Sequence, residues 1–386
     1  MAADVVEEWL ASCQPACVNG MCLRPVEHGA LKGTPLSIQK GQAEAFCLIG
    51  DDGRQWILKK FHAGRQPERG YLEAIRSVLP KGEGFLSGTA RDVLSSASLT
   101  RGPACHCSAA LAFWVDGTVL MPRISGIDWA SIADEVRDGR VRLERVHRLA
   151  LCMGLTTLVA EMERHQCCHR DLSSGNVFVD TRSWEVRLID FDSLYHPTLP
   201  FPAATTCGTA GYTAPFTWRN GGLDPAVTWC AHADRFAMTL LNVEFLVLGP
   251  GAPLTAEGGM FDQDELRARR GHGLEDVRTT LKSEYPQVVP LLESGLQSAG
   301  FEACPSPEAW NTVLDAVPGG PVKPPRLDEL EILEADFFKQ LLKKRRPAAP
   351  LWPAPSLHEL PPIDVRVPRT AVPVVTLPPD PWETGP

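Results

Sequence analysis

Three polar residues near the middle of the chain stand at a spacing that could support chemistry on phosphate groups. Asp171 is followed by Asn176 in the run H-R-D-L-S-S-G-N (169–176), and Asp190 follows in the run I-D-F-D (189–192). A carboxylate can orient a hydroxyl group and accept its proton. Amide and carboxylate oxygens are the hard ligands that Mg²⁺ prefers. The pattern therefore predicts transfer of a phosphoryl group from a magnesium-bound nucleotide to a hydroxyl group.

The two runs resemble the catalytic loop and the metal-binding segment of protein kinases, where H-R-D-L-x-x-x-N is followed by D-F-G. A third run, C-G-T-A-G-Y-T-A-P-F (207–216), resembles the end of a kinase activation segment. The resemblance covers about residues 36–317 and is to divergent bacterial serine/threonine kinases. It implies an α+β, bilobal fold, with a β-rich N-lobe and a helical C-lobe, and it implies ATP and Mg²⁺ as cofactors.

The resemblance also assigns roles within these runs. Asp171 corresponds to the catalytic acid–base residue, and Asn176 and Asp190 correspond to the magnesium ligands. Thr209 matches the threonine that contacts the catalytic aspartate, and Asp234 matches the helix aspartate that braces the catalytic loop. These residues define the expected active site.

Arg170 leaves two interpretations open. It resembles the arginine that pairs with a phosphorylated activation segment, and it could equally brace the catalytic loop. Thr205 and Thr206 lie in the activation segment and are candidate phosphorylation sites.

Lys59, in the expected strand Q-W-I-L-K-K-F (55–61), matches the strand lysine that holds the α and β phosphates. Lys60 should point to the opposite face of the strand, toward solvent. The family lysine pairs with a glutamate of the next helix, expected at 68–79, and either Glu73 or Glu68 qualifies. Sequence distance favours Glu73 as this partner in the nucleotide site.

Weaker matches to the family pattern predict the other nucleotide contacts. Gly41 is the glycine that remains of the G-x-G-x-x-G phosphate-covering loop, between alanines that still permit close approach of the backbone. Met121 resembles the gatekeeper, and the backbone near Pro122 and Ile124 resembles the hinge that meets the adenine.

Several positions depart from the family pattern. Ser173 stands where these kinases carry a lysine, and Asp192 replaces the glycine of D-F-G. Phe216 replaces a glutamate whose arginine partner is also missing, since Cys304 occupies that position. We expect apolar packing in place of this ion pair, an exchange that can leave stability unchanged.

Composition and periodicity organise the rest of the chain. Residues 1–30 read as a lead-in with one short helix, 31–124 as the N-lobe and 125–317 as the C-lobe. Residues 318–386 are rich in proline and resemble a tail with one helix at about 327–346. We expect the part up to Val317 to fold without this tail, whose helix could dock on the folded body or on a partner protein.

The bulk composition limits the partners. A net charge of -9 over 386 residues argues against nucleic acid or an anionic membrane surface. The chain shows no membrane-spanning run and no export signal, which predicts a cytoplasmic protein with reduced thiols. Two cysteine clusters could ligate zinc or simply be thiols: Cys13, Cys17 and Cys22, and Cys105, His106 and Cys107.

Three functions fit these features. The first is an ATP-dependent kinase acting on serine or threonine of a protein substrate, because every catalytic position is filled. The second is a pseudokinase or scaffold, suggested by the single loop glycine, Ser173 and Asp192. The third is a small-molecule phosphotransferase of the aminoglycoside or choline type, which shares the Asp, Asn, Asp layout but leaves Arg170 and the 208–215 run unexplained.

Overall fold

The computed structural model describes most of the chain up to Leu333. The described residues are 2–29, 31–39, 42–82, 85, 92–95, 98–100, 105–202, 208–219, 222–252, 255, 259–318, 324–327, 329–330 and 333. Gly41, Thr205 and Thr206 lie outside this set, as does most of the expected tail helix.

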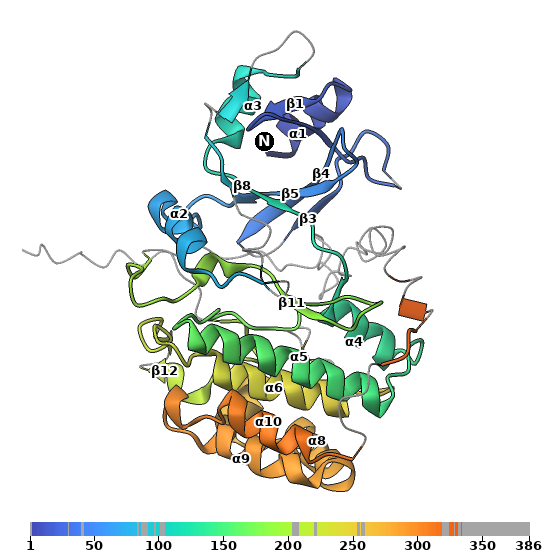
Figure 1. Cartoon of the computed structure of the whole chain (residues 1–386), viewed down its shortest axis with the longest axis vertical. Helices are drawn as coiled ribbons and strands as arrows, with labels where there is room; N and C mark the ends of the chain where they lie inside the picture. The colour runs from blue at the N-terminus through green and yellow to red at the C-terminus, as the bar shows by residue number, and fades with distance from the viewer. Residues whose placement is uncertain are drawn as a thin grey trace, which may run out of the picture. The chain divides into compact units, whose positions relative to one another are not determined.

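One antiparallel sheet dominates the first third of the chain (Figure 1). Its strands, in spatial order, are β6 (Asp92–Val93), β8 (Val119–Pro122), β5 (Gln55–Phe61), β4 (Ala43–Gly50), β2 (Met21–Pro25), β1 (Ala16–Val18) and β7 (Leu99–Thr100), with β3 (Ser37–Gln39) paired to β4. The register sets Lys59 opposite Ala45 of β4 and Val119 of β8. Lys59 therefore comes from a strand that is paired on both edges.

The N-terminal residues differ from the expected lead-in. After helix α1 (Ala2–Ala11), strands β1 and β2 form a hairpin that pairs with β4 and extends the sheet. Asn19 and Gly20 make the turn with φ of 50° and 78°. An Asn-Gly pair between apolar residues favours such a two-residue turn, because both positions need positive φ.

One pair of cysteines differs from the expectation of reduced thiols, whereas Cys13 and Cys22 are free. Cys17 and Cys105 are joined in a disulfide, and the Cys22 Sγ lies 3.5 Å from the Cys17 Sγ. Within the described residues, no group of three His, Cys, Asp or Glu side chains could hold a metal ion. The tertiary contact between two segments 88 residues apart decided this pairing.

Among the described residues, two helices lie between strands of this sheet in the sequence, and the others that come after them follow its last strand, β8. They are α2 (Arg69–Val78) and α3 (Ala109–Val115), then α4 (Trp129–Arg137), α5 (Arg145–Arg164), α6 (Asp234–Val247), α7 (Gln263–Ala268), α8 (His272–Glu284), α9 (Val289–Gln297) and α10 (Pro307–Asp315). The expected helices at 68–79, 143–165, 234–248 and 309–316 are α2, α5, α6 and α10. Among the described residues, no helix is long and apolar enough to span a membrane.

The two long helices α5 and α6 lie side by side, and α5 also packs against the strand Val186–Leu188 (Figure 1). Above them, β9 (Ile127–Asp128), β10 (Val177–Val179) and β11 (Val186–Leu188) form a second small sheet, and β12 (Trp218–Arg219) pairs with β13 (Gly222–Leu223). Residues 169–176, the catalytic run, lie between α5 and β10. Residues 189–192, the metal run, follow β11. Both runs are therefore anchored on packed elements.

Some residues after Val317 contribute to the core, in agreement with the alternative that part of the tail docks on the folded body. Leu330 is 0% exposed and Leu333 is 4% exposed, both within the main hydrophobic core. The Pro325 carbonyl accepts hydrogen bonds from Trp184 Nε1 and His147 Nε2, each at 3.0 Å. Two leucines and one carbonyl thus dock this segment despite its proline content.

Candidate active site

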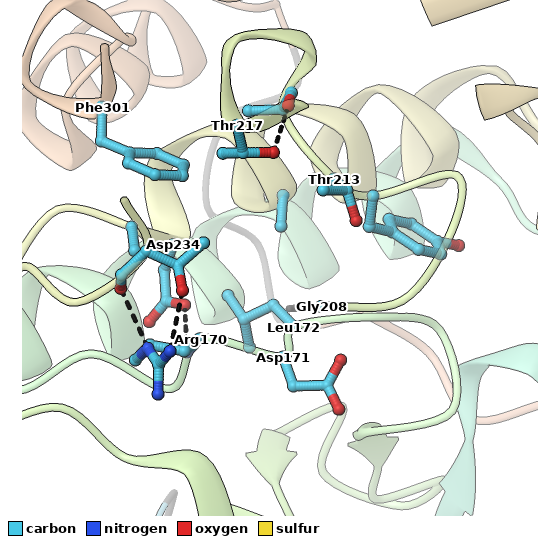
Figure 2. Close-up of a pocket in the computed structure, with 13 residues that line it drawn as sticks. Arg170, Asp171, Leu172, Gly208, Thr213, Thr217, Asp234 and Phe301 are labelled. Carbon is cyan, nitrogen blue, oxygen red and sulfur yellow. Dashed lines mark hydrogen bonds between the residues drawn. The ribbon is translucent and has the colours of Figure 1, made fainter. Parts of the chain in front are cut away.

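Asp234 at the start of α6 holds the catalytic run by its backbone. Its carboxylate accepts hydrogen bonds from the amides of His169 (2.6 Å) and Arg170 (2.8 Å), as the sequence predicted. Burial raises the pKa of the Asp234 carboxyl, while the hydrogen bonds from the two amides act in the opposite direction. Figure 2 shows the Asp234 carboxylate turned toward Arg170 and the Asp171 carboxylate pointing away from it.

The imidazole of His169 links the catalytic run to the metal run. Its Nδ1 accepts from the Asp171 amide at 3.3 Å, so Nε2 carries the proton and donates to the Ile189 carbonyl at 2.7 Å. The ring also packs on Phe191, with 4.8 Å between centroids. These contacts hold the Asp171 and Asp190 backbones at a fixed separation.

Asp171 and Asn176 lie together in the loop. Thr209 Oγ1 donates to Asp171 Oδ1 at 2.8 Å, and Asn176 Nδ2 donates to the Asp171 carbonyl at 2.8 Å. Because the Asn176 nitrogen is used in this way, the side-chain oxygen is the atom that could ligate a cation. The Thr209 contact is the one that the resemblance to serine/threonine kinases implied.

Lys59 contacts two carboxylates of the metal run, Asp190 and Asp192. Glu73 is not the partner of Lys59 that the sequence predicted. Its side chain is 57% exposed and pairs with Arg69 of the same helix at 3.0 Å. Glu68 lies just before α2 and is exposed as well. Helix α2 instead turns Tyr71, Leu72 and Ile75 inward, so neither glutamate faces the strand lysine.

Lys60 lies on the opposite face of β5, as alternation along a strand requires. It differs from the expected solvent-facing residue, because its Nζ donates to the carbonyls of Trp114 (2.6 Å) and Asp116 (3.1 Å) at the end of α3. Burial lowers the pKa of the Lys60 ammonium.

Arg170 braces the loop. Its guanidinium donates to the Thr228 carbonyl (2.9 Å) and hydroxyl (2.8 Å) and to the Ser193 carbonyl (3.0 Å). It also stacks on the Trp229 ring, with 4.7 Å from Cζ to the centroid. The Arg170 backbone has a positive φ of 68°, and the residue is only 4% exposed. These contacts favour the bracing role among the two that the sequence left open.

The buried carboxylate of Glu244 in α6 anchors the segment 208–217. The Tyr212 hydroxyl donates to Glu244 Oε2 of α6 at 2.7 Å, and Trp129 Nε1 donates to Glu244 Oε1 at 3.2 Å. Burial raises the pKa of the Glu244 carboxyl, against the lowering effect of the Tyr212 hydrogen bond and of Arg137. Gly211 has φ of 83°, and a Cβ there would lie 2.7 Å from the Phe261 carbonyl oxygen, so glycine is required.

The missing family ion pair is replaced by two rings. Phe216 meets Phe301 edge to face, with centroids 4.8 Å apart. This confirms the expected exchange of an ion pair for apolar packing. Cys304, at the position of the missing arginine, is buried.

The residues expected at the adenine lie at the end of β8. Met121 pairs with Ile57 and Pro122 with Trp56, and Met121 is buried at 8% exposure. Ile124 is partly buried against the main core. The structure thus brings Met121, Pro122 and Lys59 onto adjacent strands, while Gly41 is outside the described residues.

Two residues of the site were not assigned a partner from the sequence. Asp192 contacts Lys59, and the Tyr71 hydroxyl donates to the Leu194 carbonyl at 2.6 Å. The carboxylate in place of the D-F-G glycine was the available signal for Asp192. Tyr71 carried no signal, because an inward tyrosine of an amphipathic helix is ordinarily a core residue.

A family of known kinases matches part of the chain. Residues 113–198 match the model of the family described as "Lipopolysaccharide kinase (Kdo/WaaP) family". The matched range includes Asp171, Asn176 and Asp190 and ends before the segment 208–217. The matched family is protein-kinase-like, which supports phosphoryl transfer in general and leaves the acceptor open. No curated protein matches the chain.

Proposed function

We propose that this protein is an ATP-dependent phosphotransferase of the protein kinase type, with a bilobal arrangement of the sheet and the helices. The observation that carries the proposal is the meeting of Lys59 of β5 with Asp190 beyond β11, 131 residues later in the chain. A strand lysine beside a metal-type aspartate is the arrangement that holds a nucleotide triphosphate in kinases.

The residues fit this chemistry. Asp171 orients the acceptor hydroxyl and takes its proton late in the transfer, while Lys59 holds the α and β phosphates. Asn176 and Asp190 offer the hard oxygens that suit Mg²⁺. When bound, Mg²⁺ neutralises phosphate charge, and most of the acceleration comes from this neutralisation and from positioning.

For the acceptor, we propose a serine or threonine hydroxyl of a protein. The support is the contact between Thr209 and Asp171 and the anchoring of the segment 208–217 through Tyr212. In the resemblance to serine/threonine kinases, this segment shapes the surface that receives the peptide. From composition, we also propose a cytoplasmic location and a partner protein that docks on the proline-rich tail, residues 318–386.

A sugar hydroxyl is the second candidate. It is favoured by the description of the matched family, whose members are named for lipopolysaccharide. Because the match ends at residue 198, it does not include the segment that carries the support for a protein acceptor.

Intact-mass spectrometry tests transfer directly. Wild-type protein incubated with MgATP should gain steps of about 80 Da, the mass of one phosphoryl group, on itself or on a generic protein substrate. Asp171→Asn should gain none while it still binds ATP, and Asp190→Ala should weaken nucleotide binding only when Mg²⁺ is present.

The acceptor is decided by a parallel assay. Radiolabelled ATP is supplied with a protein mixture in one reaction and with lipopolysaccharide in the other. Label in the lipid fraction alone would replace the protein acceptor by the sugar. Label in neither fraction, with no mass change, would refute transfer.

A further inference from the structure

Lys59 lies between two carboxylates that differ in exposure. The side chain of Asp190 is 25% exposed and that of Asp192 is 8% exposed, against 11% for Lys59. Asp190 is therefore the partner on the open side, where a metal and phosphates could approach. Asp192 is the partner on the inner side.

Helix α2 does not supply this inner carboxylate. Its inward face is apolar apart from the Tyr71 hydroxyl, and its acids stand on the outer side. Glu73 is engaged with Arg69. A buried ammonium needs a charged partner, because an isolated charge is costly to keep out of water.

Asp192 is held in place from three directions. Its neighbour Phe191 packs on His169, with ring centroids 4.8 Å apart. On its other side, the Ser193 carbonyl accepts from Arg170 at 3.0 Å, and the Leu194 carbonyl accepts from Tyr71 at 2.6 Å. The short 3₁₀ turn η3 (Phe191–Ser193) is thus anchored to the catalytic loop and to α2.

We propose that Asp192 is the residue that positions Lys59 for the nucleotide phosphates, in the place that a helix glutamate takes in protein kinases. This inference rests on the proposed function. Asp192 is a positioning residue here, because it acts through the Lys59 ammonium. Asp190 is left to the metal when the nucleotide binds.

Helix α2 then has a different connection to the site. It is tied to the metal run by Tyr71 and Leu194, and Lys59 is tied to the same run by Asp192. Both links meet within three residues, so the inner carboxylate partner of Lys59 comes from the metal run and not from α2.

The test compares Asp192→Asn with the matched control Glu73→Gln, which removes a carboxylate from α2. The first readout needs no activity. Folded protein without nucleotide is pulsed with acetic anhydride, and acetylation of Lys59 is measured by mass spectrometry. Without the Asp192 carboxylate, the Lys59 ammonium loses its inner partner, so its acetylation should speed several-fold, whereas Glu73→Gln should match wild type.

The second readout is turnover. Asp192→Asn should lower kcat/KM for MgATP by about tenfold or more, since a charge-assisted contact is lost. Lys59→Met should cause a similar loss, and Lys59→Met/Asp192→Asn should lose little beyond it. The Mg²⁺ concentration that supports half-maximal rate should rise in Asp190→Asn and stay near wild type in Asp192→Asn.

Folding of the variants is part of the test. If Asp192→Asn unfolds while the double variant folds, the Lys59 ammonium without its inner partner is the cause and the proposal is supported. If both unfold, Asp192 serves the fold independently of Lys59 and the proposal is wrong. Unchanged acetylation in a folded Asp192→Asn, or a larger shift in Mg²⁺ requirement than in Asp190→Asn, would also overturn it. Wild-type protein without transfer would refute only the proposed function, since acetylation still decides the pairing.

Discussion

The segment after Val317 should be required for folding, although its composition suggests a tail. We predict that a chain ending at Val317 is strongly destabilised, whereas a chain ending at Lys344 folds normally. The second end point is the control, because a chain ending at Lys344 keeps every residue that the structure describes. The first removes Pro325, Leu330 and Leu333.

The size of the effect follows from three contacts. Each fully buried leucine contributes about 1.5–3 kcal/mol to the free energy of unfolding. Loss of the Pro325 carbonyl leaves Trp184 Nε1 and His147 Nε2 without their acceptor, at about 1 kcal/mol each because truncation opens them to water. The total of about 5–8 kcal/mol is comparable with the whole stability of an ordinary domain, about 5–15 kcal/mol.

The assay is urea unfolding followed by tryptophan fluorescence, with Leu330→Ala as a milder variant. Leu330→Ala should lower the free energy of unfolding by about 2–5 kcal/mol. The chain ending at Val317 should be insoluble or unfold at much lower urea than the chain ending at Lys344. Equal unfolding midpoints for the two truncations would refute the reasoning.

Three further predictions use the same structure. Thr205→Ala/Thr206→Ala should keep wild-type transfer rates, because Arg170 is already braced by Thr228, Ser193 and Trp229; a loss of more than about tenfold in a kinase assay would show that Arg170 waits for a phosphate. Phe216→Glu should lower the free energy of unfolding by about 2 kcal/mol or more, because a carboxylate would face the Phe301 ring, with Phe216→Leu as the control; unfolding in urea measures both. Burial lowers the pKa of His147, which lies beside Glu144 and Arg148, so the unfolded chain binds this proton more tightly and stability falls as pH drops below about 6.5. His147→Gln should flatten that slope in urea unfolding between pH 5 and 7, and an unchanged slope would contradict the assignment.

The sequence located the parts of the site that depend on local spacing. Asp171, Asn176 and Asp190 stand on short runs beside strands and helices whose apolar periodicity was readable, and the elements β5, α2, α5 and α6 were predicted close to their observed bounds. The expected backbone role of Asp234 and the exchange of an ion pair for the Phe216 ring were also readable, because each is a substitution at a fixed place in a run.

The hairpin of β1 and β2 was a readable feature that the prediction missed. Asn19 and Gly20 are a turn signal, but strands of three and five residues are too short to show a clear alternation. The short strands gain their stability from pairing with β4, and that partner is distant in the sequence.

What the sequence by itself determined was the set of chemical groups and the order in which the chain presents them: an acid, an amide and two further acids after a strand lysine. Only the tertiary structure decided which of these groups meet. The helical periodicity of α2 is compatible with either Glu73 or Tyr71 on the inner face, and in the structure Tyr71 faces inward and its hydroxyl donates to the Leu194 carbonyl. That rotation moves Glu73 to the surface and leaves Asp192 as the inner partner of Lys59, because a buried ammonium pairs with the carboxylate that the fold brings beside it.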